Sequence, residues 1–253
     1  MYYLTMDQSG SVKEHYDKHL GSLYSWMIGD FQTLVQRQKE EFTKAGIAEG
    51  GSAIALDLGA GNGVQTVALC DMGYKVTAID FNKQLLEELR ANTVEHEVHI
   101  IKDDLLVGYK LDISPSLVVC CGDTIAHLPD YTKLEELIAG SYSCLTEGGK
   151  LYLTFRDYSR ALEGTDRFIP VRQDETKIFM CFLEYFDERV RVTDILLEKV
   201  GGRWEQKISY YFKLRITVAM IEDILQRYGF EIVYKQLSGM NVLVGQKGKA
   251  NDA

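Results

Sequence analysis

The sequence predicts an α/β fold in which helices cover both faces of a doubly wound, mostly parallel seven-stranded sheet. Two observations support this prediction. Short apolar strands alternate with helical segments from residue 54 to residue 155, and a glycine-rich turn follows the first strand. Apolar strands that alternate with helices are typical of a parallel sheet that is buried on both faces.

The expected elements follow from the hydrophobic pattern and from the residues that end each segment. Strands are predicted at residues 54–58, 75–79, 98–101, 117–120, 151–155, 230–236 and 241–244. Helices are predicted at residues 64–72, 82–95, 131–145 and 217–228. Gly73 and Gly229 stand just past two of these helices, where glycine commonly ends a helix. Ser238 and Gly239 mark the turn of a hairpin between the last two strands.

Two further parts flank this sheet. Residues 12–45 form one or two amphipathic helices, in which Tyr16, Tyr24 and Trp26 act either as a lid or as helix core. Strands rich in β-branched and aromatic residues follow Arg156, with a Gly201–Gly202 hairpin. They are expected at residues 178–185, 189–199 and 204–214. We expect a helical cap at 1–50, a core at 51–160, an inserted antiparallel β-sheet at 161–215 and completion of the core by 216–253.

Composition excludes several classes of protein. The 253 residues include 28 Lys and Arg against 37 Asp and Glu, and the resulting charge of −9 disfavours binding to nucleic acid. The five cysteines form no C-x-x-C pair, which favours reduced thiols and a cytoplasmic location. No signal peptide, membrane span or metal-binding motif is recognised, so we expect no metal and no membrane partner.

The glycine-rich turn resembles a nucleotide-binding loop. Gly59 and Gly61 let the main chain turn tightly and approach a ligand, whereas Gly63 comes one residue too early for a dinucleotide site. Asp57 would repel a pyrophosphate but suits a ligand that carries an ammonium group. Asp80, at the end of the second strand, is placed to accept hydrogen bonds from ribose hydroxyls.

An ammonium, a carboxylate and a ribose occur together in S-adenosylmethionine. At these positions the sequence resembles the class I S-adenosylmethionine-dependent methyltransferases, which implies a Rossmann-like fold and this cofactor. The resemblance also implies an acid that meets the adenine amino group, at Asp103 or preferably Asp104. The cofactor-binding residues expected from it are Asp57, Gly59, Ala60, Gly61, Gly63, Asp80, Phe81, Asp104, Leu105 and Cys121. For Cys121, a packing role is the alternative.

Three segments suggest the acceptor class. The Asn-Pro-Pro-Tyr-like residues of methyltransferases that act on bases or glutamine amides are absent after the fourth strand. Instead, residues 126–130 (Ala-His-Leu-Pro-Asp), 155–158 and 209–211 resemble glycine N-methyltransferase and related small-molecule N-methyltransferases. This resemblance places the catalytic and substrate-binding residues at Asp123, His127, Arg156 and Tyr211.

The departures from that family change the expected acceptor. Asp123 stands where glycine N-methyltransferase has Asn, and a carboxylate there favours an acceptor with a basic or polyhydroxylated end over glycine. Arg156 either anchors a substrate anion or pairs with Asp157 or Asp130. His127 either accepts a proton or is bonded to a backbone carbonyl.

The sequence thus predicts transfer of a methyl group from S-adenosylmethionine to a small molecule, with an amine nitrogen as the favoured acceptor atom. The enzyme would mainly align the two reactants. O-methylation of a small acid or phenol is one alternative, and binding of the cofactor without turnover is another. The oligomeric state stays open, with a homodimer as one possibility.

Overall fold

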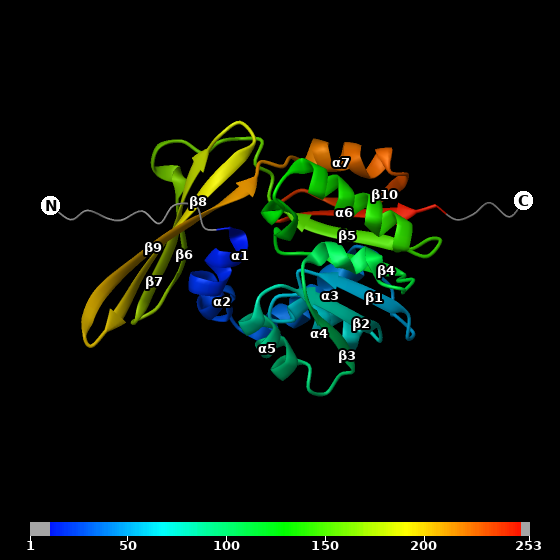
Figure 1. The fold of residues 1–253 in the computed structure, drawn as a ribbon, viewed down its shortest axis with the longest axis horizontal. Helices are drawn as coiled ribbons and strands as arrows, with labels where there is room; N and C mark the ends of the chain where they lie inside the picture. Colours follow the sequence, from blue (N-terminus) through cyan, green and yellow to red (C-terminus); the bar gives the residue numbers. More distant parts are fainter. Residues whose placement is uncertain (1–10, 249–253) are drawn as a thin grey trace, which may run out of the picture.

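The computed structural model describes residues 11–248, which form two β-sheets and the helices around them (Figure 1). The larger sheet has seven strands in the order β10-β11-β5-β4-β1-β2-β3. Strand β11 runs antiparallel to the other six strands. The strands of this larger sheet are β1 (Ile54–Leu58), β2 (Lys75–Asp80), β3 (Val98–Lys102), β4 (Leu117–Cys120), β5 (Lys150–Phe155), β10 (Phe230–Gln236) and β11 (Asn241–Lys247). The predicted fold class is confirmed.

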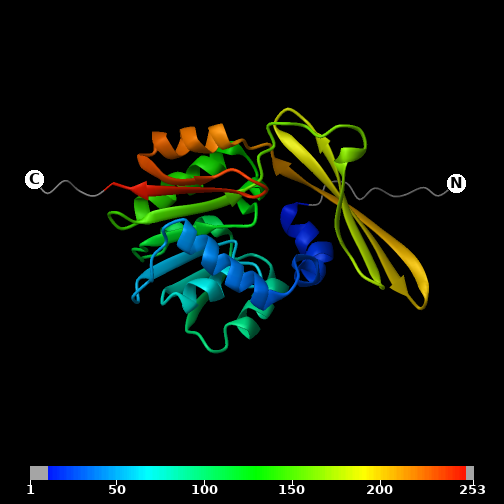
Figure 2. The same ribbon diagram turned by 180° about the vertical axis from the view of Figure 1, so that it is seen from behind.

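Helices cover both faces of this sheet because neighbouring residues of its strands point to opposite sides. Ala55 of β1 packs with residues of α3 and α4, whereas Leu56 packs in a separate cluster with residues of α6 and α7. Figure 2 shows α3 lying across the first of these faces. The helices are α3 (Phe31–Lys44), α4 (Val64–Asp71), α5 (Lys83–Asn92), α6 (Tyr131–Cys144) and α7 (Val218–Arg227). Short 3₁₀ helices add η2 (Leu105–Lys110), η3 (Thr124–His127) and η4 (Gly164–Arg167).

The smaller sheet is antiparallel and has four strands in the order β6-β7-β8-β9. Its strands are β6 (Phe168–Gln173), β7 (Lys177–Tyr185), β8 (Arg189–Val200) and β9 (Arg203–Leu214). The sequence predicted three of them, and the Gly201–Gly202 turn between β8 and β9 is as expected. Strand β6 was missed because it is a largely exposed edge strand that contains Pro170, and such a strand lacks the pattern of buried alternate residues.

The N-terminal helices lie between the two sheets (Figure 1). α1 (Val12–His15), the π-helical turn η1 (Tyr16–Leu20) and α2 (Gly21–Ile28) form one continuous helical run, which ends at Gly29 with φ 109°. The first ten residues of the predicted cap lie outside the described residues. α3 then packs on the large sheet, where the fully buried Phe42 meets Tyr152 edge-on at 4.9 Å between ring centroids.

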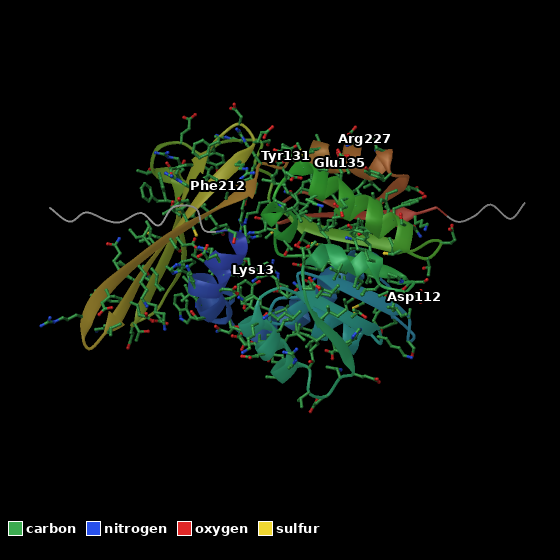
Figure 3. All side chains as sticks on the ribbon, viewed as in Figure 1. Lys13, Asp112, Tyr131, Glu135, Phe212 and Arg227 are labelled. Atoms are coloured by element: carbon green, nitrogen blue, oxygen red, sulfur yellow. The ribbon has the colours of Figure 1, made fainter. Side chains whose placement is uncertain are left out.

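Polar contacts hold the outer elements in place. The Tyr131 hydroxyl of α6 donates to the Glu188 carbonyl at 3.1 Å, which ties the large sheet's helix to the turn before β8. Arg227 of α7 pairs with Glu135 of α6 at 2.9 Å, and Figure 3 shows both side chains on the same side of the molecule. These contacts fix α7 against α6, and α6 against the small sheet.

Within residues 11–248, no helix has both the length and the apolar character needed to cross a membrane. The same part of the chain holds no group of three or more His, Cys, Asp or Glu side chains arranged to bind a metal ion. All five cysteines are free thiols.

Phe42 provides a test of how firmly α3 belongs to the core. We expect Phe42→Ala to lower the free energy of unfolding by about 3–5 kcal/mol, because it removes a fully buried ring and leaves a cavity. Chemical denaturation measures this, with Val94→Ala, at an 82% exposed position, as the control. A loss below about 1 kcal/mol would contradict the packing of α3 described here.

Candidate active site

The glycine turn after β1 has the backbone conformation that only glycine adopts easily. Gly59, Gly61 and Gly63 have φ values of 78°, 55° and 95°. A Cβ atom on Gly59 would lie 2.5 Å from Thr124 Cγ2, so a side chain there would collide with the turn after β4. Gly63 immediately precedes α4 and packs against Leu89. At Gly59 and Gly61 the turn therefore brings bare main chain to the carboxyl ends of the strands.

Asp80 fixes this turn from the neighbouring strand. Its carboxylate accepts hydrogen bonds from the main-chain N–H groups of Gly61 at 2.9 Å and Asn82 at 2.8 Å. Burial raises the pKa of Asp80, and the backbone hydrogen bonds to Asn82 and Gly61 act in the opposite direction. Because Asp80 also lines the cavity described next, its remaining lone pairs are available to a ligand.

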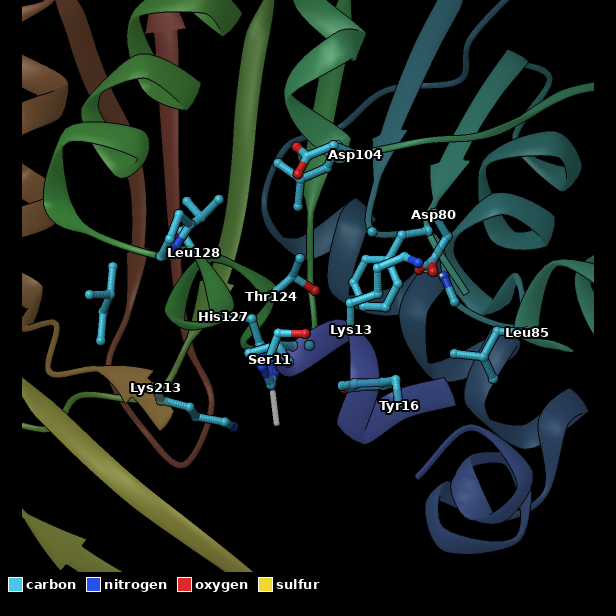
Figure 4. A pocket seen from close by; sticks show the side chains of 18 of the residues that line it. Ser11, Lys13, Tyr16, Asp80, Leu85, Asp104, Thr124, His127, Leu128 and Lys213 are labelled. Atoms are coloured by element: carbon cyan, nitrogen blue, oxygen red, sulfur yellow. Dashed lines mark hydrogen bonds between the residues drawn. The ribbon is translucent and has the colours of Figure 1, made fainter. Parts of the chain in front are cut away.

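A cavity of about 850 Å³ opens at this edge of the large sheet. Figure 4 shows Tyr16, Asp80, Thr124 and His127 around it. One wall comes from the ends of the large sheet's strands: Gly59, Gly61, Asp80, Phe81, Lys102, Asp103, Asp104, Leu105, Gly122 and Thr124. The opposite wall comes from His127, Leu128, Pro129, Arg189, Phe212, Lys213 and Leu214. The N-terminal helices and α5 complete it with Ser11, Val12, Lys13, Tyr16, Tyr24 and Leu85.

The structure brings many of the sequence-predicted residues to this cavity, but not all of them. The predicted cofactor-binding residues on its lining are Gly59, Gly61, Asp80, Phe81, Asp104 and Leu105. Asp57, Ala60, Gly63 and Cys121 are not part of the lining. Of the predicted catalytic residues, only His127 lines it, and Asp123, Arg156 and Tyr211 do not. The roles of all these residues remain predictions.

Asp57 is buried beneath the glycine turn, with 1% of its surface exposed. Its carboxylate accepts a hydrogen bond from the Thr66 hydroxyl of α4 at 2.6 Å. Burial raises the pKa of Asp57 to about 7. The hydrogen bond from Thr66 lowers this pKa, and the nearby charge of Asp80 raises it further. Asp57 therefore supports the turn from below.

Asp123 does not present the unpaired carboxylate that the sequence suggested. Its carboxylate is 2% exposed and accepts from Lys213 Nζ at 2.7 Å, the Tyr158 hydroxyl at 2.8 Å and the Arg156 main-chain N–H at 2.9 Å. Lys213 neutralises its charge, so the expectation that Asp123 selects an acceptor with a cationic end is wrong. Sequence analysis could not detect this pair because Lys213 lies 90 residues further along the chain.

Arg156 also differs from the expectation of an anion anchor in the site. The side chain is exposed, lies outside the cavity lining and forms no ion pair within residues 11–248. The alternative of pairing with Asp157 or Asp130 is not observed either. Asp157 instead accepts from the main-chain N–H of Val218 at 2.8 Å, at the start of α7.

His127 stands at the centre of an aromatic group. Its ring stacks on Tyr211, with centroids 5.4 Å apart and 17° between the planes, and meets Tyr16 edge-on at 5.7 Å. Tyr16 in turn contacts Phe81 at 5.8 Å, so one ring joins the two walls of the cavity. Burial, and then the charge of Lys213, hold the pKa of His127 well below its usual range.

His127 is therefore a neutral imidazole at neutral pH. Its Nδ1 atom is buried and has no hydrogen-bond partner among the described residues, so the alternative of a carbonyl-bonded Nδ1 is not supported. A buried ring nitrogen without a partner is unusual, and His127 itself lines the cavity.

A second buried pair fixes the N-terminal helices, and sequence analysis missed it. His15 Nε2 of α1 lies 2.9 Å from Asp194 Oδ2 of β8, and both side chains are almost fully buried. The His15 ring also lies 4.4 Å from that of Tyr211. The only sequence signal was the position of His15 beside Tyr16 in an aromatic helical segment. This pair holds the segment that carries Tyr16 against the small sheet.

The raised pKa of Asp57 predicts a particular pH dependence of stability. The folded protein keeps a proton on Asp57 up to about pH 7, whereas the unfolded chain releases it near pH 4, so stability falls as the pH rises between these values. We expect wild type to lose on the order of 2 kcal/mol more than Asp57→Asn between about pH 5 and pH 8. Denaturant unfolding at several pH values measures this, with Asp112→Asn at an exposed position as control. Parallel stability curves for wild type and Asp57→Asn would contradict the prediction.

Comparison with known proteins agrees with this geometry. Residues 55–149 match the family described as a methyltransferase domain. Over 119 residues, the chain is 29% identical to a ubiquinone biosynthesis O-methyltransferase of Xanthomonas axonopodis pv. citri (strain 306). That match covers 45% of this chain and 47% of the relative, so the chain aligns with about half the length of this curated protein.

Two solved structures resemble the fold over most of the chain. The CcbJ methyltransferase of Streptomyces caelestis has a TM-score of 0.75 at 17% identity, covering 94% of this chain and 99% of that one. CalS10, an amino pentose methyltransferase of Micromonospora echinaspora solved with bound S-adenosylmethionine, has a TM-score of 0.68 at 15% identity, covering 87% and 92%. Residues 55–149 thus match a methyltransferase domain, and the fold of the chain is that of these solved methyltransferases.

Proposed function

We propose that the protein transfers a methyl group from S-adenosylmethionine to an amine nitrogen of a small molecule. The observation that carries this proposal is that one cavity holds both the Asp80-braced glycine turn and the neutral imidazole of His127. The amino pentose methyltransferase among the structural neighbours supports it at the level of fold. The finer resemblance to glycine N-methyltransferase stays a prediction.

The residues on one wall fit the proposed cofactor. A Cβ on Gly61 would point toward Tyr24, 3.8 Å away, so the absence of a side chain leaves room beside the main chain. Asp80 offers lone pairs to ribose hydroxyls, and Asp104 offers a carboxylate to the adenine amino group. Phe81 and Leu105 provide apolar surface on the same wall.

The chemistry requires alignment more than acid or base. When bound, the cofactor supplies a sulfonium that activates its methyl group toward displacement by a nucleophile. The protein orients the nucleophile, and near-attack alignment contributes about 7–11 kcal/mol in favourable cases. Tyr16 and Tyr24 cover the cavity from the N-terminal helices and restrict the access of water.

His127 favours nitrogen over a hydroxyl oxygen as the acceptor atom. An amine that binds in its neutral form reacts through its own lone pair, and a neutral His127 can accept an N–H hydrogen bond that orients this lone pair. A phenol or alcohol needs a base, and an imidazole whose pKa is held well below its usual range is a weak one. O-methylation is the second candidate, because the curated relative is named an O-methyltransferase.

The direct test is incubation with methyl-labelled S-adenosylmethionine and a small-metabolite extract, followed by mass spectrometry of the labelled products. Labelled amines support the proposal. Labelled ethers or esters, without labelled amines, support the second candidate. Tight cofactor binding without any labelled product indicates a binding protein without turnover.

Asp80 tests the cofactor assignment. We expect Asp80→Ala to weaken binding of S-adenosylmethionine by roughly 1–3 kcal/mol, because charge-assisted hydrogen bonds to the ribose are lost. Isothermal titration calorimetry measures the affinity, and Asp80→Asn, which keeps one carbonyl oxygen, should lose less. Asp112→Ala is the control at an exposed position. Unchanged affinity in Asp80→Ala would remove the ribose assignment.

His127 separates the two acceptor atoms. For an amine acceptor, we expect His127→Phe, which keeps an aromatic ring beside Tyr211, to lower kcat by less than about 100-fold, since a general base usually contributes 10²–10⁴-fold. The affinity for the cofactor should not change. In wild type, kcat/KM should rise with pH up to the pKa of the acceptor amine. A loss of kcat above about 1000-fold would contradict this expectation and show that His127 acts as a base, the role that O-methylation requires.

A further inference from the structure

The carboxylates on the cavity lining all belong to one wall. Asp80, Asp103 and Asp104 lie on the wall assigned to the cofactor, together with Lys102, and Lys13 lines the cavity from the N-terminal helices. The opposite wall, which faces the acceptor, carries Arg189 and Lys213 but no carboxylate on its lining. An acceptor that enters this side therefore meets positive charge.

Lys213 is committed to a partner inside the protein. Its Nζ lies 2.7 Å from Asp123, and only 11% of its side chain is exposed. The two charges cancel, so this pair leaves the acceptor side close to neutral. The net positive charge of this wall must then come from Arg189.

Arg189 is an unpaired cation in a fixed place. It is the first residue of β8 and is exposed, and its Nη2 donates to the Pro129 carbonyl at 3.1 Å. It forms no ion pair with a carboxylate of residues 11–248. The guanidinium has further N–H donors in a planar fork, a shape that matches carboxylate and phosphate groups.

The surface between Arg189 and His127 is apolar. Leu128 and Pro129 follow His127 directly, and Leu214 is the register partner of Arg189 across β8 and β9. Phe212 completes this surface on β9. From His127 to Pro129 the chain advances by two residues, which is at most about 7 Å in an extended conformation.

We propose that the acceptor is an amine that also carries an anionic group, a carboxylate or a phosphate, which Arg189 binds at the rim of the cavity. The apolar part of such a molecule lies on Leu128, Pro129 and Leu214, and its amine reaches His127. This inference rests on the proposed methyl transfer and adds the chemical class of the acceptor and the residue that selects it.

The test uses primary amines in matched sets of three: a carboxylate, a phosphate monoester and the neutral carboxamide of the same carbon skeleton. The skeletons place one to six carbons between the amine and the acidic group. Methyl transfer from labelled S-adenosylmethionine gives kcat/KM for wild type, Arg189→Gln and Arg189→Lys. Arg203→Gln is the matched control, because Arg203 is also exposed and also begins a strand of the small sheet.

We expect wild type to prefer at least one anionic form over its carboxamide by tenfold or more. Arg189→Gln should lose this preference through a higher KM for the anionic form, with the carboxamide changed less than twofold. Arg189→Lys should keep part of the preference for the anionic form, and Arg203→Gln should keep all of it. The better of the carboxylate and the phosphate identifies the anion.

Three results would overturn the inference. In the first, wild type has the same kcat/KM for the anionic and the neutral amines. In the second, Arg189→Gln lowers kcat/KM equally for both. In the third, the protein binds the cofactor but methylates none of the anionic amines. The proposed function survives the first two results, because methyl transfer to amines still occurs in them. Failure to bind S-adenosylmethionine, measured separately by calorimetry, would instead remove the proposed function and this inference with it.

Discussion

The geometry of the cavity depends on the buried ion pair between Asp123 and Lys213. Asp123 follows β4 of the large sheet and Lys213 belongs to β9 of the small one, so their 2.7 Å contact joins the two sheets. Asp123 also has a left-handed backbone, with φ 71°, which is uncommon for a residue other than glycine and persists only where its surroundings hold it. Removing one partner of such a pair is costly because the other charge stays buried without compensation. The pair thus fixes the wall that contains Lys213 relative to the strand ends of the large sheet.

The N-terminal helical run forms a third wall of the cavity and is held by its own buried contact. His15 Nε2 lies 2.9 Å from Asp194 Oδ2 of the small sheet. The ring of the neighbouring Tyr16 contacts Phe81 on one wall and His127 on the other. The sequence left open whether these aromatic residues form a lid or helix core, and the structure places them differently. Tyr16 and Tyr24 line the cavity, whereas Trp26 donates to Asp174 at 2.6 Å outside it.

Sequence reasoning succeeded where the signal is local. The apolar strands, the glycine turn and Asp80 all lie within short segments whose pattern indicates their position. The structure places Gly59, Gly61 and Asp80 on the cavity lining, and their role in cofactor binding stays a prediction. It failed for Asp123 because the charge of a residue in the sequence does not reveal a partner 90 positions away. Arg189 was missed for a similar reason, since only the pairing of β8 with β9 and the contact with Pro129 bring it to the site.

Lys213 links the electrostatics of the site to its chemistry. Burial, and then the same ammonium that neutralises Asp123, lower the pKa of His127, so its imidazole carries no charge. Under the proposed methyl transfer, an entering amine would lose its proton before it reaches His127, because a neutral, desolvated surrounding disfavours the ammonium form. An anionic group would keep its charge at the exposed Arg189, because water still solvates that position and the charge is not buried. Under the two proposals, this difference along one cavity would let Arg189 hold the acceptor through its charge at the rim while the acceptor nitrogen stays neutral inside.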